Sequence, residues 1–155
     1  MVSSAVAAVE AALRSAGVEP DLRPFPEPVP TAAAAAAVLR CQVGAIANSL
    51  VFEEAAEPLL VLASGAHRVD TARLAQRLGS GKIRRAAPEF VLEHTGQRIG
   101  GVAPVGHPTP VRTVVDPDLA QFPVVWAGGG DEFTMFATSF DELLKITGGT
   151  AIAVA

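Results

Sequence analysis

The sequence has little of several residues and motifs on which common protein chemistries depend. Of its 155 residues one is cysteine, Cys41, which excludes an internal disulfide and is typical of a reducing cytoplasm. There is no tyrosine and no Gly-x-Ser-x-Gly motif, so a Ser-His-Asp hydrolase has no support. The histidines, His67, His94 and His107, do not show a metal-binding spacing such as His-x-x-x-His. The histidines therefore give no support for a metal site.

Long apolar runs are missing as well. Half of the residues are hydrophobic, yet no run approaches the roughly 20 residues of a membrane span. The alanine run Ala32–Ala37 is too short and too weakly hydrophobic, and Met1–Ser4 has no basic residue, so we expect no signal peptide. These features predict a cytoplasmic protein without membrane contact. The length predicts one domain, residues 1–155, with a substantial core.

The formal net charge of −4 argues against sequence-indifferent binding of nucleic acid, but the charge is unevenly distributed. Between Arg68 and Arg85, six basic residues stand against one acidic residue, Asp70, which gives a local charge of +5. Such a span can contact a phosphate backbone or form a solvated helix face, and the sequence leaves both open. Its basic residues are Arg68, Arg73, Arg77, Lys82, Arg84 and Arg85.

Local signals predict short helices and short strands in irregular alternation. Ser3 or Ser4, Thr31, Asp70 and Ser139 are placed to cap helices, and Pro88 is placed to start one. Strands are predicted at residues 44–53, 59–64, 83–86, 111–115, 124–127 and 133–137, with an extended proline-rich edge at 22–30, a turn at 116–118 and a strand or tail at 150–155. No repeat is present. The pattern predicts an α+β (mixed α/β) fold, in which a curled mixed β-sheet or barrel is surrounded by short helices.

Two polar residues stand out in the strand predicted at residues 44–53. Strand alternation places Asn48 on one face with Ile46, Leu50 and Phe52, and Ser49 on the other. A polar amide among large apolar side chains must find hydrogen bonds or face a cavity. Asn48 and Ser49 are therefore candidate binding residues.

Two glycine-rich loops complete the candidate site. The loop Thr95–Pro110 has four glycines and three prolines, and a loop so shaped can present backbone amides to an oxyanion or a phosphate. The second loop is Gly128–Gly130. Either can instead be a tight turn between strands. Phe25 is interpreted as a core anchor or a lid, and Cys41 as a packing residue.

Motifs along nearly the whole chain resemble, in order, those of the YbaK/ProX family. This family comprises the free-standing relatives of the editing domain of bacterial prolyl-tRNA synthetase. The motifs are Gly44–Phe52, Ser64–Asp70, Gly100–Gly106, and residues 125–130 followed by Thr147–Gly149. The resemblance implies a mixed α/β domain that hydrolyses the ester of a mischarged aminoacyl-tRNA, such as alanyl- or cysteinyl-tRNA for proline, without metal or organic cofactor.

The resemblance also implies roles for individual residues. The loop Gly100–Pro104 would hold the aminoacyl carbonyl, with a positioned water or the terminal ribose hydroxyl assisting, and the basic span would contact the acceptor stem. The implied partner is the acceptor end of an aminoacyl-tRNA; association with a synthetase is left open, as is the choice between monomer and homodimer. The predicted residues are Gly100, Gly101 and Asn48 for catalysis, and Phe25, Ser49, Val102, Pro104, Gly128 and Gly129 for substrate binding.

Asn48 is a departure from the family pattern. Many members carry a lysine at this position, which is thought to hold the terminal adenosine, whereas an asparagine can donate only neutral hydrogen bonds. Three outcomes stay open: altered substrate preference, replacement of the lysine by an arginine such as Arg98 or Arg112, or loss of catalysis. The last would leave a binding module for an aminoacyl group, a nucleotide or a tRNA end.

Overall fold

A computed structural model gives the structure of residues 3–155. The predicted absence of a signal peptide rests partly on Met1 and Val2, which lie outside the described residues. The elements are α1 (Ser4–Ser15), β1 (Leu22–Pro24), α2 (Ala32–Leu39), the 3₁₀ turn η1 (Val43–Ala45), β2 (Ile46–Glu54), β3 (Glu57–Ser64), α3 (Thr71–Leu78), β4 (Ile83–Arg85), α4 (Pro88–Thr95), β5 (Arg112–Val115), the 3₁₀ helix η2 (Pro117–Gln121), β6 (Val125–Gly128), β7 (Thr134–Thr138), α5 (Phe140–Thr147) and β8 (Thr150–Ala151).

The predicted helix caps are confirmed. Ser3, Thr31, Asp70 and Ser139 each accept a hydrogen bond on the side chain from a backbone N–H in the first turn of α1, α2, α3 and α5 respectively. Three helices, α3, α4 and α5, end at a glycine in the left-handed conformation. A residue with a Cβ atom adopts this conformation only at an energetic cost. These glycines are Gly79 after α3, Gly96 after α4 and Gly148 after α5.

The strands form one mixed sheet, as predicted. Its order within the described residues is β1-β7-β6-β2-β3-β5-β8, with β4 paired to β2 beside this path. Pairs β2/β3, β6/β7 and β1/β7 are antiparallel, whereas β2/β6, β3/β5 and β5/β8 are parallel. The path leads from β1 to β8 without a ladder between them, so the sheet is open rather than a barrel.

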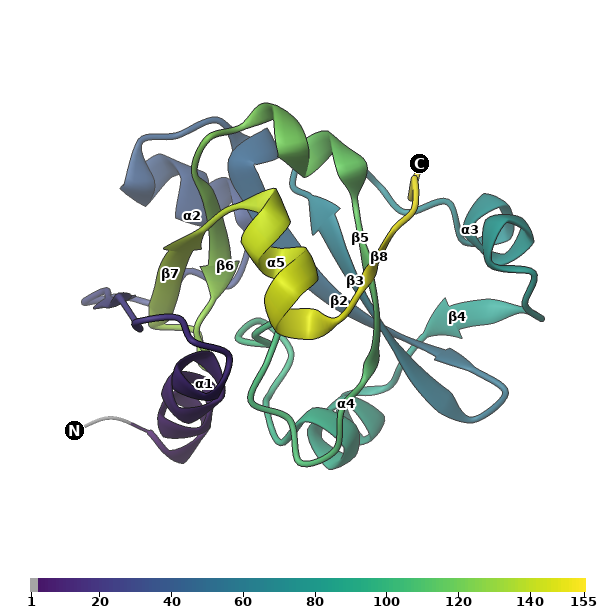
Figure 1. The fold of residues 1–155 in the computed structure, drawn as a ribbon, viewed down its shortest axis with the longest axis horizontal. Helices are drawn as coiled ribbons and strands as arrows, with labels where there is room; N and C mark the ends of the chain where they lie inside the picture. The colour runs from purple at the N-terminus through teal and green to yellow at the C-terminus, as the bar shows by residue number, and fades with distance from the viewer. Residues whose placement is uncertain (1–2) are drawn as a thin grey trace.

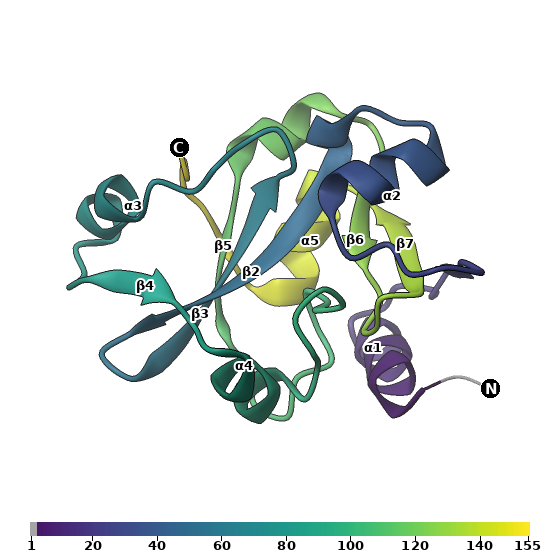
Figure 2. The same cartoon turned by 180° about the vertical axis from the view of Figure 1, so that it is seen from behind.

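Helices cover both faces of this sheet. α5 crosses one face (Figure 1), and α2 lies on the other, as the view from behind shows (Figure 2). The largest apolar cluster joins Val9 and Leu13 of α1 and Leu143 of α5 to alternate residues of β2 and β3. A second cluster packs Leu74 of α3 on Phe52, and a third joins α2 to β2, β6 and β7.

Two predicted boundaries were wrong. The strand expected from Gly44 begins at Ile46, because Gly44 packs so close to Phe122 that a Cβ atom would lie 2.9 Å from its ring, and residues 43–45 form η1. The turn expected at 116–118 leads into η2, whose first amide is capped by the Asp116 carboxylate. Only Thr150 and Ala151 of the last six residues are in a strand. Among residues 3–155, none of the helices has the length and apolar character needed to cross a bilayer.

Candidate active site

A pocket of about 300 Å³ lies where β2 parts from β6. In Figure 2, α2, the segment between α4 and β5, and the β6–β7 hairpin surround the same part of β2. The volume is at the lower end of the range for small-ligand sites. The pocket is lined by Val29–Ala32 and Ala35 before and within α2, Ile46–Val51 of β2, Arg85 and Ala86, Val91 of α4, Ile99, Gly100 and Val102 of the first glycine loop, and Gly128, Asp131, Thr134 and Met135.

The pairing of β2 explains why the pocket opens here. Its ladder with β6 consists of Ile46–Trp126 and Ala47–Ala127, and its ladder with β4 starts only at Phe52–Arg85. Residues 48–50 therefore have no strand beside them on this edge. Main-chain groups alternate in direction along a strand, and the Val51 carbonyl accepts from the Ala86 amide on this side. The main chain of Ser49 consequently faces the gap.

The polar pair predicted from the sequence lies in this gap. Asn48 and Ser49 are both half-buried and both line the pocket, although strand alternation sends their side chains to opposite faces. The Ser49 Oγ is buried and has no hydrogen-bond partner within residues 3–155. Such buried unsatisfied atoms are uncommon, so the hydroxyl points to a ligand contact.

The glycine loop is held in shape by a side chain that the sequence analysis did not single out. Gln97 is buried, its Oε1 accepts from the Ala103 amide at 2.7 Å, and its Nε2 donates to the Val105 carbonyl at 3.1 Å. His107 closes the same turn through Nε2, 2.9 Å from the Ala103 carbonyl oxygen. Gln97 thus acts as an internal brace across the loop. The only available signal was a glutamine between the glycines, which does not indicate burial.

Amides of this loop divide into engaged and available groups. The Gly101 amide donates to the Arg98 carbonyl at 3.0 Å, and the Ala103 amide to Gln97. The amides of Gly100 and Val102, both pocket-lining residues, have no hydrogen-bond partner in the described part of the chain. Two alternate donors at the pocket wall are therefore available to a ligand oxygen.

The two glycine loops touch each other, and each contact requires a glycine. A Cβ atom on Gly101 would lie 2.5 Å from the Asp131 main chain, and one on Gly128 would lie 2.7 Å from the Val102 carbonyl oxygen. Side chains at either position would separate the loops. The missing side chains thus set the width of the pocket at this side.

The structure brings together some of the predicted site residues and not others. Asn48, Ser49, Gly100, Val102, Gly128 and Arg85 line the pocket. Gly101, Pro104 and Gly129 are buried behind it and support the loops. Phe25 is outside the lining and packs on the apolar cluster of Val29, Ala35, Ile46 and Met135, which forms one wall, so it supports that wall from behind.

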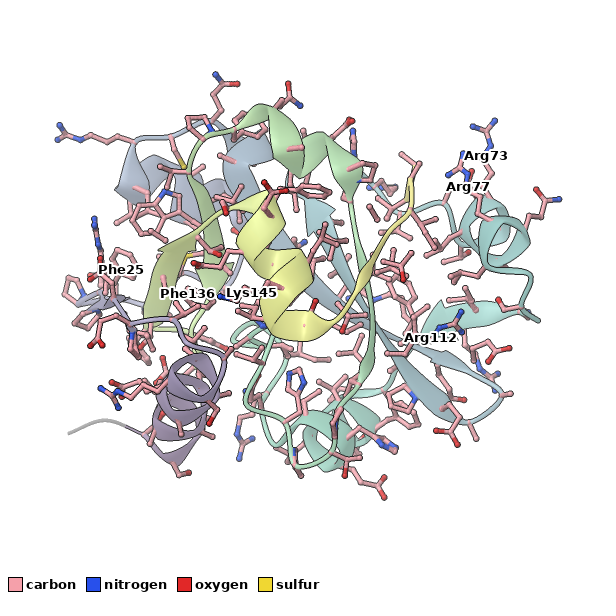
Figure 3. The ribbon with its side chains drawn as sticks, viewed as in Figure 1. Phe25, Arg73, Arg77, Arg112, Phe136 and Lys145 are labelled. Carbon is pink, nitrogen blue, oxygen red and sulfur yellow. The ribbon has the colours of Figure 1, made fainter. Side chains whose placement is uncertain are left out.

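Most of the basic span lies away from the pocket. Figure 3 shows Arg73 and Arg77 on α3, at the opposite end of the molecule from Phe25. Arg77 donates to the carbonyls of Ala153 and Ala155, Arg73 is 3.6 Å from Asp70, and Arg84 is 3.2 Å from Glu53. Arg68 and Lys82 are exposed and outside the lining. Within the span, Arg85 alone reaches the pocket.

A further cluster unites residues far apart in the sequence. His67 Nδ1 is 2.7 Å from the buried Asp116 carboxylate, and His67 Nε2 is 2.9 Å from the Asp118 carboxylate. Asp116 also accepts from the amides of Ser64 and Asp118. These ligand types can hold a metal ion, but their polar atoms already bind one another. The cluster joins the end of β3 to η2, outside the pocket.

The pKa values of two side chains, Cys41 and His107, are shifted in the direction that favours the neutral form. Burial raises the pKa of the Cys41 thiol, while its backbone hydrogen bond opposes the shift, so the thiolate needed by a nucleophile is disfavoured. Cys41 packs on the α2 cluster, in agreement with its interpretation as a packing residue. Burial lowers the pKa of His107, and its hydrogen bond to Ala103 opposes that shift.

This arrangement suits catalysis by orienting the substrate and stabilising charge on it, rather than by a pair of acid and base side chains. The charged residues of the lining are Arg85 and Asp131, which have opposite signs. Asp131 is held by the Ser3 hydroxyl at 3.1 Å and the Phe133 amide at 2.9 Å. Available amides next to a polar strand residue can bind a carbonyl and stabilise the negative charge that develops on it.

Two known proteins are similar to this chain in sequence. The chain is 33% identical over 130 residues to the uncharacterised protein YwhH of Bacillus subtilis (strain 168), covering 83% of this chain and 82% of YwhH. It is 31% identical over 80 residues to the proline–tRNA ligase of Lysinibacillus sphaericus (strain C3-41), covering 52% of this chain but 14% of the ligase.

Solved structures extend the comparison to the whole fold. A crystal structure described as a candidate trans-editing enzyme for prolyl tRNA synthetase has a TM-score of 0.92 and 37% identity, covering 99% of this chain and 98% of the other. The hypothetical protein APE2540 has a TM-score of 0.87 and 30% identity, covering 95% and 98%. Residues 26–146 match the model of the aminoacyl-tRNA editing domain. The resemblance seen in the ordered motifs is thereby confirmed, and the chain belongs to the aminoacyl-tRNA editing domain family.

Proposed function

We propose that this protein is a trans-acting aminoacyl-tRNA deacylase whose pocket between β2 and the two glycine loops binds the aminoacyl ester. The observation that carries the proposal is the convergence of Asn48, Ser49, Gly100 and Val102 on one pocket of about 300 Å³. Family membership supplies the reaction class. The similarity to a proline–tRNA ligase supports alanyl- or cysteinyl-tRNA for proline as the substrate.

In the proposed reaction the amides of Gly100 and Val102 bind the ester carbonyl oxygen. Water attacks the carbonyl carbon and forms a new C–O bond, and the carbonyl oxygen takes the negative charge of the tetrahedral intermediate. The bond to the ribose oxygen then breaks, and that oxygen takes up the proton that the attacking water gives up. The products are the free amino acid and a tRNA with a free terminal hydroxyl. Oriented donors of this kind contribute factors of about 10²–10³ each.

In this scheme the attacking water is activated by its orientation next to the ester and not by a strong general base. No carboxylate pair lies in the lining of the described pocket, and Asp131 is already held by two donors. The terminal ribose hydroxyl beside the ester can orient the attacking water, so the substrate contributes to its own hydrolysis. Asn48 is placed to bind a ribose or phosphate oxygen as a neutral donor.

The test is release of amino acid from a panel of purified aminoacyl-tRNAs, with the protein at catalytic concentration and a chelator present. We expect turnover on one or two members, alanyl- or cysteinyl-tRNA for proline among them. A folded protein that releases nothing from any member would contradict the proposal.

A second candidate is a binding module of the same fold that does not hydrolyse the ester. Asn48 favours it, because the family resemblance implies a lysine at this position and this chain has an asparagine. The variant Asn48→Lys distinguishes the two. Hydrolysis gained by an inert protein would support the binding module, whereas a fall in an already active one would show that Asn48 takes part in the reaction.

A further inference from the structure

Arg85 is the cation of the pocket. Among the lining residues of the described chain it is opposed by one acidic residue, Asp131, whose carboxylate is already engaged by Ser3 and Phe133. The Arg85 guanidinium makes no ion pair within residues 3–155 and is exposed at the rim. The Arg85 guanidinium is therefore available to an anionic ligand at the rim of the pocket.

The sheet fixes where this charge lies. Arg85 pairs with Phe52 across β4 and β2, and its guanidinium carbon is 5.7 Å from the Phe52 ring centroid. Strand alternation places Asn48 on the same face of β2 as Phe52, about 13 Å away along the strand. Asn48 and Arg85 thus lie on the same face of the sheet with the apolar Leu50 between them, and the guanidinium stacks on the Phe52 ring.

The other arginines considered as replacements for the family lysine lie elsewhere. Arg112 is on β5 and lines a different pocket beside Arg77 and Thr147, and Figure 3 shows it at the end of the molecule near α3. Arg98 is exposed and outside the lining, although its carbonyl closes the turn to Gly101. Arg84, the neighbour of Arg85, pairs with Glu53 at 3.2 Å. The expectation that Arg98 or Arg112 replaces the lysine therefore does not fit the structure.

We infer that Arg85 is a substrate-positioning residue that binds the phosphate preceding the terminal adenosine of the acceptor end. This inference rests on the proposed function. A guanidinium can donate two parallel hydrogen bonds to a phosphate, a geometry that a lysine does not offer. Arg85 would thus supply the charge-assisted contact that Asn48 cannot make, from the other end of the same strand face.

Nucleotide binding tests the inference without requiring hydrolysis. The probes are adenosine 5′-monophosphate and adenosine, titrated by calorimetry or NMR into the wild type, Arg85→Gln and the matched control Arg84→Gln. We expect the wild type to bind the monophosphate about tenfold or more tightly than adenosine, as charge-assisted hydrogen bonds allow. Arg85→Gln should erase this preference, and Arg84→Gln should keep it. Equal affinities in the wild type, or equal losses in the two variants, would overturn the inference.

Kinetics on the preferred aminoacyl-tRNA supply the second readout. Arg85→Gln should raise KM by about tenfold and change kcat by less than about threefold, since a positioning contact acts mainly on binding. Adding Asn48→Lys to Arg85→Gln should bring KM back toward the wild-type value, as a cation on the same face of the sheet would. A fall in kcat with unchanged KM would exclude the positioning role. If no aminoacyl-tRNA is hydrolysed, the proposed function fails, and the monophosphate preference still decides the role of Arg85.

Discussion

Gln97 shows how one buried side chain can determine the geometry of a loop. Its amide group satisfies one donor and one acceptor of the main chain, at Ala103 and Val105, both of which are buried. A loop of glycines and prolines makes few hydrogen bonds of its own, so the side chain replaces the ladder that a strand would provide. The positions of the Gly100 and Val102 amides follow from this brace.

The variant Gln97→Met tests the brace. Methionine fills a similar volume but leaves the Ala103 amide and the Val105 carbonyl without partners, so we expect a loss of about 2–4 kcal/mol in the free energy of unfolding. Urea denaturation measures it. Gln121→Met is the matched control, because Gln121 is exposed and donates to the Asp118 carbonyl; its effect should stay within about 0.5 kcal/mol. Similar effects of the two substitutions would contradict the assignment.

The candidate site was only partly predictable at the scale of residues. Asn48 and Ser49 could be singled out, because polar residues in an apolar strand conflict with local patterning. Gln97 could not, since burial in a loop has no periodic signal. Arg85 was one of six basic residues, and only the pairing of β4 with β2 distinguishes it from Arg84. Side-chain direction in a three-residue strand depends on register, which the sequence does not specify.

Among the elements, the contact between the two glycine loops determines the shape of the pocket. Gly101 lies against the main chain of Asp131, and the Val102 carbonyl lies against Gly128. Neither loop belongs to a helix or a strand at these contacts, apart from Gly128 at the end of β6. Bulk added at Gly101 would therefore separate the two loops as well as alter the loop to which catalysis is assigned.

We expect Gly101→Ala to lower both stability and substrate binding. The new methyl group would lie 2.5 Å from Asp131 main-chain atoms, so one loop must move, at a cost of about 1–3 kcal/mol. Thermal unfolding and monophosphate titration measure the two effects. Gly81→Ala is the control, since its nearest neighbour would be a Glu54 carboxylate oxygen at 3.7 Å. An unchanged Gly101→Ala protein would show that the loops adapt without affecting the pocket.

Element identity was easier to predict than element pairing. The caps at Ser3, Thr31, Asp70 and Ser139 follow from hydrogen bonds within one turn, so the local sequence specifies them. The neighbours of β2 are β3, which follows it directly, β4, and β6, which is more than 70 residues away. Long-range pairing depends on how all the apolar faces are covered at once. The mixed sheet could be predicted as a class, and its strand order could not.

For the molecule as a whole, the partly buried His107 makes stability depend on pH. Burial lowers the pKa of His107 from its ordinary value of 6.5, so the fold favours the neutral ring. The unfolded chain takes up the proton first as the pH falls, so the stability contributed by the neutral ring is present above pH 6.5 and is lost below it. A histidine that gains an acidic partner on folding stabilises the fold at low pH, whereas His107 makes the fold less stable at low pH.

Comparison of the wild type with His107→Gln isolates this effect. Glutamine can still donate to the Ala103 carbonyl but does not titrate, so the wild type should lose more stability than the variant between about pH 7.5 and 5.5. Urea denaturation at several pH values gives the difference directly. Parallel pH profiles for the two proteins would show that His107 does not contribute.

The ladder between β2 and β6 consists of two residue pairs, and the pocket lies beside it. On one side lie β1, β7 and β6, and on the other β2, β3, β4, β5 and β8, and within the sheet they share only Ile46–Trp126 and Ala47–Ala127. The pocket opens directly beyond this short ladder, between the two halves of the sheet. A ligand in the pocket would contact β2 from one half and β6 and β7 from the other, and would so add a connection between half-sheets that are joined by two residue pairs.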